Sequence, residues 1–154
     1  MKWKTFVFWI GLAEIVGILS GLVSMEGMAR FAENITQPPL SPPAVLFPIV
    51  WTVLYALMGF GAARIYYSPD RKERSMGLNL FILQLVLNFL WSPLFFNRQA
   101  YGAAFILLLL LLGTVLAMSV SFYKADPLAG KLQIPHIIWL SFAAYLNLGV
   151  WYLN

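Results

Sequence analysis

Aromatic side chains recur at helical spacing inside an apolar stretch of this sequence. Phe47, Trp51 and Tyr55 are four residues apart and Met58 follows, so all of them share one face of a helix. In a helix that faces lipid, Trp and Tyr belong at the two membrane interfaces. Trp51 lies roughly 10 Å inside the stretch at about 1.5 Å per residue. Its ring therefore needs a packed core or a flat ligand as its neighbour.

Two further stripes combine aromatic and amide side chains at spacings of three or four residues. Their members are Gln84, Asn88, Trp91 and Phe95 in one stripe, and Trp139, Ala143, Leu146 and Asn147 in the other. An unpaired amide in hydrocarbon is costly, so these groups face a partner or a cavity. Two interpretations stay open. The amides bond across helices while the rings fill the core, or the three stripes line a ligand pocket.

Few ionisable side chains occur within the apolar stretches. A charged acid near the centre of a span faces the interior or is protonated, and proton relays normally use several such groups, so Glu14 alone argues against a relay. His136 could ligate a haem iron, but a single histidine near an interface more often caps a helix or contacts headgroups. The sequence has no Ser–His–Asp set, carboxylate pair or phosphate-binding glycine loop, and it has no cysteine. We therefore expect no metal site and no conventional catalytic site, which leaves enzymatic activity open.

The composition is that of a membrane protein. Of the 154 residues, 61% are hydrophobic and only 10% are charged, whereas a soluble domain is about 25% charged. Five apolar stretches are each long enough to cross a bilayer as a helix, and they cover residues 6–24, 44–63, 78–96, 101–123 and 134–153. The sequence predicts an all-α membrane protein in which a bundle of five transmembrane helices forms a single domain over residues 1–154 around an internal ligand pocket. A signal peptide is the other interpretation of the first stretch, which its length and Glu14 disfavour.

The basic residues are divided unequally between the two sides of the predicted bundle. Arg30 and Arg98 lie on one side, and the other side carries Lys2, Lys4, Arg64, Arg71, Lys72, Arg74, Lys124 and Lys131. The positive-inside rule therefore places the N-terminus in the cytoplasm and the C-terminus outside, in a bacterial cell membrane. Because these charges sit in short connections between spans, we expect membrane lipids as partners and no nucleic acid.

Residues 25–43 form the longest connection. They include the sequence PPLSPP at 38–43, which denies a helix and favours extended structure. A long ordered connection over a bundle is often a lid, and a plain spacer is the alternative. Ala13, Gly17 and Gly21 give the first span a smooth face, which favours close packing within the bundle over a homodimer interface.

Three segments closely resemble the TspO/MBR family, the translocator proteins also called tryptophan-rich sensory proteins or peripheral benzodiazepine receptors. They are SPPAVLFPIVWTVLYALMGFGAA (41–63), LVLNFLWSPLFF (85–96) and IIWLSFAAYLNLGVWYLN (137–154). The resemblance implies a bundle of five membrane helices with a pocket for porphyrins, benzodiazepine-type drugs and, in animals, cholesterol. By the same resemblance and the stripes above, the pocket is expected to use Phe47, Trp51, Tyr55, Asn88, Trp91, Trp139, Ala143 and Leu146.

The resemblance implies a membrane receptor or sensor that binds a tetrapyrrole such as protoporphyrin IX or a drug-like small molecule, with no required cofactor. Light-dependent degradation of bound porphyrin, with Trp51 and Trp139 as electron donors, is one alternative, and porphyrin or sterol transport is another. Two departures matter. Leu40 replaces the tryptophan of the family's Trp-x-Pro-Pro pattern, and the residues after Trp151 lack the Lys or Arg of the animal cholesterol pattern, so we do not expect a sterol role. Family members form dimers, and a homodimer is an open possibility here.

Overall fold

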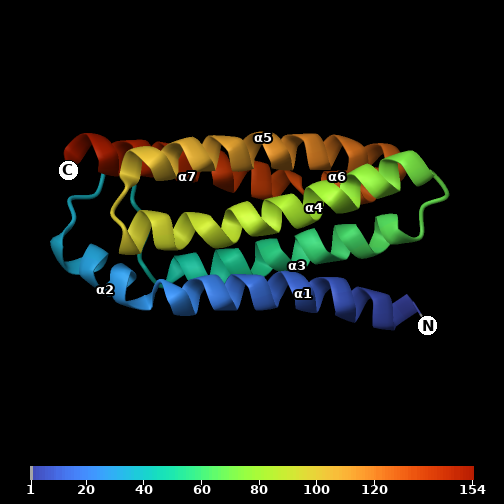
Figure 1. The fold of residues 1–154 in the computed structure, drawn as a ribbon, viewed down its shortest axis with the longest axis horizontal. Helices are drawn as coiled ribbons and strands as arrows, with labels where there is room; N and C mark the ends of the chain where they lie inside the picture. The colour runs from blue at the N-terminus through green and yellow to red at the C-terminus, as the bar shows by residue number, and fades with distance from the viewer. Residues whose placement is uncertain (1) are drawn as a thin grey trace.

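The computed structural model describes residues 2–154, and its five long helices run side by side (Figure 1). The elements in chain order are α1 (Lys2–Val23), α2 (Met25–Asn34), α3 (Leu46–Tyr66), α4 (Arg71–Ser92), the π-helical η1 (Pro93–Asn97), α5 (Tyr101–Ala125), α6 (Pro127–Lys131) and α7 (Ile134–Leu153). Five helical segments are long and apolar enough to cross a membrane: α1, α3, α4 with η1, α5, and α6 with α7. The predicted class, an all-α membrane protein with five spans, is confirmed.

Some helices extend beyond the apolar stretches that predicted them. The span expected at 78–96 begins at Arg71, where the Asp70 carboxylate accepts a hydrogen bond from the Glu73 backbone N–H at 3.1 Å. At α6, Asp126 caps the helix in the same way, accepting from the Leu128 N–H at 3.2 Å. Such caps satisfy backbone donors that have no partner within the helix. The Asp70 cap therefore begins α4 before its apolar part, and the Asp126 cap begins the short helix α6 that precedes α7.

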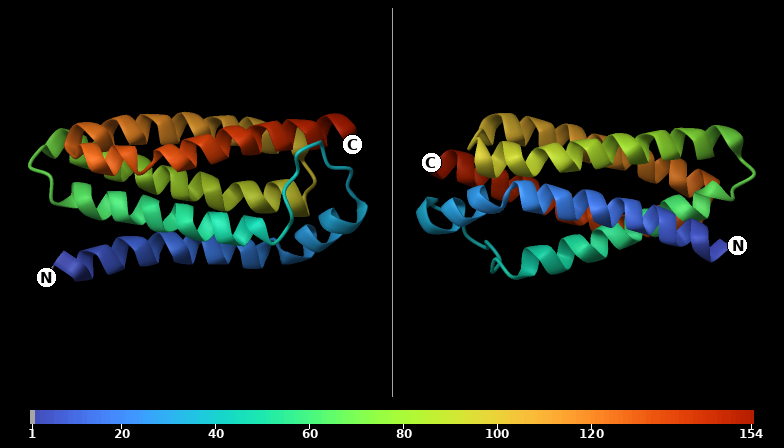
Figure 2. Two further views of the ribbon diagram at one scale, coloured as in Figure 1. Left: turned by 180° about the vertical axis from the view of Figure 1, so that it is seen from behind. Right: turned by 60° about the horizontal axis from the view of Figure 1, so that its bottom comes forward.

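The helices pack as neighbours in the bundle, α1 on α3, α4 on α5, and α5 on α7 (Figures 1 and 2). Gly59 of α3 allows close approach, since a Cβ there would overlap the backbone of Ile10 in α1. The centre of the bundle holds fully buried apolar side chains, among them Met58, Phe81, Met118, Phe122 and Leu140. This core lies between the middle of the bundle and the end that carries the N-terminus.

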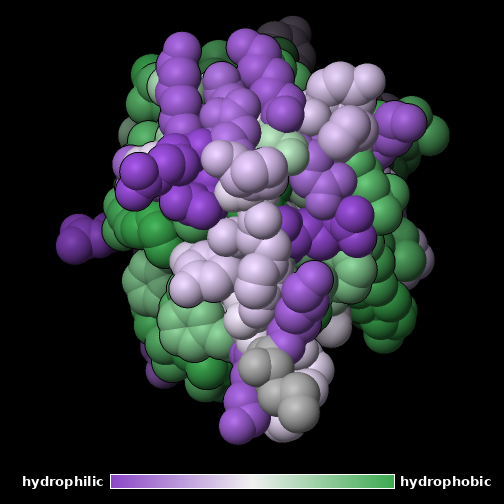
Figure 3. Space-filling view, turned by 90° about the vertical axis from the view of Figure 1, so that its right-hand side faces the viewer, coloured by the Kyte–Doolittle hydropathy of each residue, from purple (hydrophilic) through white to green (hydrophobic). Residues whose placement is uncertain are grey.

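At the end with the N-terminus, which we call the basic end, the connection between α3 and α4 lies against the connection between α5 and α6. Arg64 Nε donates to Asp126 Oδ2 at 2.7 Å, and Ser68 Oγ donates to the Ala125 carbonyl at 3.1 Å. Hydrophilic side chains cover this face, with apolar side chains around its edges (Figure 3). The structure therefore gathers most of the basic residues at one end of the bundle, whereas Arg30 and Arg98 lie at the other end. That this end is cytoplasmic stays a prediction.

The opposite end, called the α2 end, is closed by α2 and the segment 35–45. The helix α2 covers part of the connection that the sequence left as a loop, whereas 35–45 has no helix, as its prolines predict. Asn97 Nδ2 donates to the Val23 carbonyl at 2.9 Å, and Gly27 lies against the Phe96 backbone, so α2 is seated on η1. The segment 35–45 then runs across to α7 before α3 begins (Figure 2).

Three contacts hold the segment 35–45 along α7. Tyr145 Oη donates to the Pro39 carbonyl at 2.7 Å. Thr36 and Asn154 exchange two hydrogen bonds, at 3.1 Å to Asn154 Oδ1 and at 2.8 Å from Asn154 Nδ2. The third contact is Pro38, which is buried against Gly149. The segment is therefore fastened at several points over the α2 end of the bundle.

Candidate ligand-binding site

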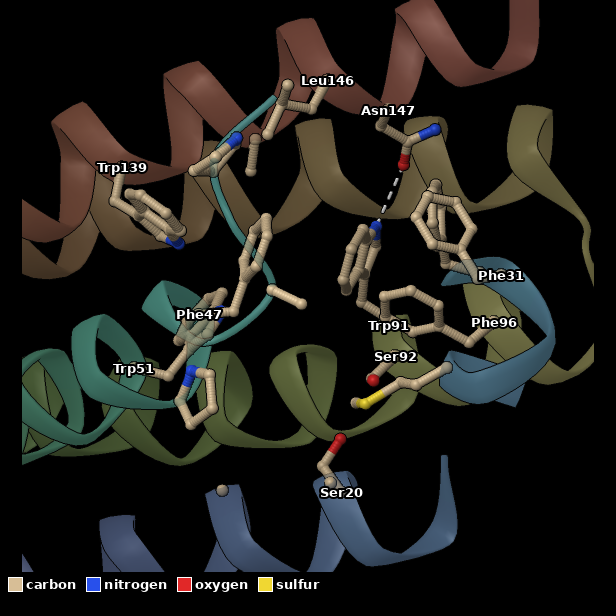
Figure 4. A pocket seen from close by; sticks show the side chains of 18 of the residues that line it. Ser20, Phe31, Phe47, Trp51, Trp91, Ser92, Phe96, Trp139, Leu146 and Asn147 are labelled. Atoms are coloured by element: carbon tan, nitrogen blue, oxygen red, sulfur yellow. Dashed lines mark hydrogen bonds between the residues drawn. The ribbon is translucent and has the colours of Figure 1, made fainter. Parts of the chain in front are cut away.

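A cavity of about 490 Å³ lies in the half of the bundle nearer α2, between α1, α3, α4 and α7 (Figure 4). It is roofed by α2 and the segment 35–45. The structure brings together at its walls all the residues expected from the sequence: Phe47, Trp51, Tyr55, Asn88, Trp91, Trp139, Ala143 and Leu146. That these residues bind a ligand stays a prediction.

One wall of the cavity is an aromatic group shared by α3 and α7. The ring centroids of Trp51 and Trp139 are 6.4 Å apart with perpendicular planes. Phe47 meets Trp139 edge to face at 5.7 Å, and Trp51 lies 5.6 Å from Tyr55. Edge-to-face pairs at these distances are attractive, because the positive edge of one ring meets the negative face of the other. In this part of the bundle, α3 and α7 therefore contact each other through the aromatic side chains of Phe47, Trp51 and Trp139.

The other aromatic wall is held by a hydrogen bond that crosses between helices. Trp91 stacks on Phe95 at 4.8 Å, and its Nε1 donates to Asn147 Oδ1 at 3.1 Å (Figure 4). Asn147 Nδ2 in turn donates to the Tyr101 carbonyl at 2.9 Å. Asn147 belonged to the third stripe but not to the expected site residues, although it lines the cavity. Its side chain fixes the plane of Trp91.

The deeper members of two stripes lie below the cavity and do not line it. Met58 and Gln84 are fully buried. Asn88 Nδ2 donates to the Gln84 carbonyl at 3.1 Å and to Gln84 Oε1 at 2.6 Å, within the same helix. The amide bond expected across helices is made by Asn147 at the cavity wall, whereas Asn88 and Gln84 bond within α4. That the stripes bind a ligand stays a prediction. The stripes line the cavity near α2 and become hydrogen-bonded core toward the basic end.

The floor along α1 is made of small and polar residues that sequence reasoning did not place in the site. Ser20 Oγ donates to the Phe89 carbonyl at 3.0 Å. A Cβ on Gly17 would lie 2.5 Å from the Tyr55 ring, whereas a Cβ on Gly21 would meet nothing within 4 Å. Of the small residues of α1 that we expected to pack against other helices, only Ala13 and Gly17 do so. The last of them, Gly21, borders open space.

His136 does not occupy the interface position that its place in the sequence indicated. The side chain is 1% exposed, and its ring lies 6.1 Å from that of Trp51. The expected headgroup contact is wrong, because α6 and Gln133 precede α7 and carry the helix past this histidine toward the basic end. His136 packs behind Trp51 and does not line the cavity. Within residues 2–154, no cluster of His, Cys, Asp and Glu could hold a metal.

Trp139 has an unused hydrogen-bond donor. Its Nε1 is buried and has no partner within residues 2–154. Figure 4 shows the edge of the ring that bears this nitrogen turned to the cavity. A buried indole N–H usually finds a partner. Because this nitrogen is buried, a ligand in the cavity would reach it only after neighbouring side chains move.

The fold and this site define a class, a helical membrane protein with five spans around an aromatic cavity. Residues 9–153 match the TspO/MBR family, and the chain belongs to it. The Tryptophan-rich protein TspO of Chlorobaculum tepidum is 32% identical over 97% of this chain and 96% of its own length. The Translocator protein of Sus scrofa is 32% identical over 97% and 89%. Protein CrtK of Rhodobacter capsulatus is 36% identical over 79% and 77%.

Proposed function

We propose that the protein is a membrane receptor that binds a flat, largely apolar tetrapyrrole such as protoporphyrin IX in this cavity. The observation that carries the proposal is the placement of Trp51, Trp91 and Trp139, from three different helices, around one space of about 490 Å³. That volume falls within the range of about 300–1,000 Å³ that is typical of ligand pockets. Stacking on an aromatic side chain stabilises a flat ring by about 1–3 kcal/mol, judged from nucleic-acid bases.

Family membership supports the same ligand class. The resemblance set out above implies a pocket for porphyrins and benzodiazepine-type drugs, and the residues that carry it line this cavity. Binding requires no cofactor.

The test is a titration of the purified protein with protoporphyrin IX, followed by quenching of tryptophan fluorescence. We compare the wild type with Trp51→Phe and Trp139→Phe, which keep an aromatic ring but lose stacking area and, at Trp139, the donor. Trp3→Phe is the matched control, because Trp3 is 60% exposed and does not line the cavity. We expect the cavity variants to bind about tenfold more weakly. Unchanged affinity in both would overturn the proposal.

Light-dependent degradation of bound porphyrin is a second candidate function, favoured by the adjacency of Trp51 and Trp139. Their ring centroids are 6.4 Å apart at the same cavity wall, so either indole could give an electron to a photoexcited porphyrin, which passes it to oxygen. The superoxide so formed would oxidise the porphyrin ring, and the ring would return one electron to the indole radical, so that the net reaction is oxidation of porphyrin by oxygen. Illumination of the complex with and without oxygen tests this. The candidate predicts an oxygen-dependent absorbing product that free porphyrin does not form and that is lost when Trp51 and Trp139 are both replaced by phenylalanine.

A further inference from the structure

The helices α1 and α3 separate toward the α2 end. They are in backbone contact where Gly59 meets Ile10, and they still touch where Gly17 meets the Tyr55 ring. At Gly21, one turn further along α1, a Cβ would meet nothing within 4 Å. The right-hand view of Figure 2 shows the two ribbons drawing apart in this direction. Since Gly21 also lines the cavity, the cavity extends into this opening.

The opening reaches the lipid-facing surface of the bundle. Several residues that line the cavity here are also exposed: Ile18 of α1 is 60% exposed, and Pro48 and Thr52 of α3 are exposed as well. A residue that is both exposed and part of the cavity wall marks the rim of a window. We call this gap, bordered by Glu14, Ile18, Gly21, Pro48 and Thr52, the lateral window.

Glu14 is the one ionisable side chain of this rim. It lies on the same face of α1 as Gly17 and Gly21, at spacings of three and four residues, and it lines the cavity. Within residues 2–154 its carboxyl group has no ion pair and no hydrogen bond to a side chain or backbone group. Acids within membrane spans usually pair with another group, because a lone carboxylate in hydrocarbon is costly.

The cavity surface around Glu14 is aromatic. Tyr55 packs over Gly17, one turn from Glu14, and Trp51 adjoins Tyr55 at a centroid distance of 5.6 Å. A carboxylate beside aromatic faces is the combination that recognises ammonium groups, since the cation is attracted to the acid and to the ring quadrupoles.

We propose that Glu14 is a specificity-determining residue that makes the cavity select aromatic ligands carrying a protonated amine, which enter from the bilayer through the lateral window. The amine donates to the Glu14 carboxylate at the rim, and the ring lies against Tyr55 and Trp51. This selectivity goes beyond tetrapyrrole binding and does not depend on it.

The experiment uses two probes with one ring system, 1-naphthylmethylamine and 1-naphthylmethanol, and the full chain in phosphatidylcholine nanodiscs. At pH 7 the amine is cationic and the alcohol is neutral. Calorimetric titration gives the ratio of their dissociation constants. We expect the wild type to prefer the amine by about tenfold, the size of one charge-assisted hydrogen bond. Glu14→Gln, which keeps the shape and removes the charge, should lose this preference while its affinity for the alcohol stays the same.

Glu26→Gln is the matched control, because Glu26 is an exposed acid of α2 outside the cavity lining, and it should keep the wild-type ratio. An equal ratio in wild type and Glu14→Gln would overturn the proposal, as would a wild type that binds neither probe. Loss of both probes in Glu14→Gln would also overturn it, because it would assign Glu14 a structural role. A failure here leaves the protoporphyrin titration unaffected, so the two proposals stand or fall separately.

Discussion

The Nε1 of Trp91 donates a hydrogen bond to Asn147 Oδ1 at 3.1 Å, which ties α4 to α7 at the cavity wall. Through Asn147 Nδ2 and the Tyr101 carbonyl the connection continues to α5. One amide therefore holds three helices and the plane of one cavity ring.

Asn147→Leu should destabilise the protein and weaken ligand binding together. Leucine keeps the volume, but it leaves the Trp91 N–H without a partner, at about 1–3 kcal/mol for a buried group, and it removes the tie to the Tyr101 carbonyl of α5. Thermal unfolding in detergent measures the loss. Asn34→Leu, at the exposed end of α2, is the control. An unchanged midpoint in Asn147→Leu would contradict the role of this amide.

Alanine should have opposite consequences at two glycines of α1. Gly17→Ala places a Cβ 2.5 Å from the Tyr55 ring, so the ring must move, and we expect destabilisation of about 1–3 kcal/mol. Gly21→Ala meets open space and should unfold like the wild type or slightly later, since alanine favours helix. Denaturant unfolding of the pair measures both. Equal destabilisation at the two positions would show that α1 and α3 stay in contact beyond Tyr55.

Leucine at Gly21 should obstruct the lateral window. The side chain would extend into the gap between α1 and α3, so association of protoporphyrin IX from lipid should slow about tenfold or more. Stopped-flow quenching in nanodiscs measures the rate. Gly113→Leu is the control, because a Cβ there also meets nothing within 4 Å but the residue does not line the cavity. Equal rates in the two variants would show that ligands use another route.

The contacts of the segment 35–45 should set how long a ligand stays bound. Tyr145→Phe removes the hydrogen bond to the Pro39 carbonyl, and Asn154→Ala removes the pair with Thr36. Each contact contributes about 1 kcal/mol, so each change should speed protoporphyrin dissociation about fivefold. Tyr152→Phe, at an 88% exposed tyrosine, should leave the rate unchanged. Identical rates in all three variants would show that this segment does not retain the ligand.

The sequence predicted those parts of the site that depend on spacing along one helix. Trp51 and Tyr55, or Trp139 and Ala143, must share a face because a helix repeats every 3.6 residues or so. The family resemblance then predicted that the three stripes line one cavity. Hydrophobicity also located the spans, although the Asp70 cap begins α4 before its apolar part and the Asp126 cap begins a separate short helix, α6.

What the sequence could not give are relations between residues that are far apart along the chain. His136 was placed at an interface because its span begins nearby, yet it is 1% exposed and its ring lies against Trp51 of α3. The bond from Tyr145 to Pro39 joins residues with no pattern in common. In the sequence Gly21 and Gly17 are equivalent members of one face, but because α1 and α3 diverge, Gly17 contacts the Tyr55 ring and Gly21 borders open space.

The aromatic contact between α3 and α7 gives the cavity tolerance to ligand shape. Where two helix backbones are in contact, as at Gly59 of α3 and Ile10 of α1, the space between the helices can widen only if a whole helix moves. Between α3 and α7 the contact is made by the rings of Trp51 and Trp139, so rotation of these two side chains is enough to change the width of the cavity. The helices α1 and α5 hold the other sides of α3 and α7 in place meanwhile. With the helix backbones unchanged, the cavity can thus accommodate ligand rings of different shape, and each ligand requires only a change of rotamer at Trp51 or Trp139.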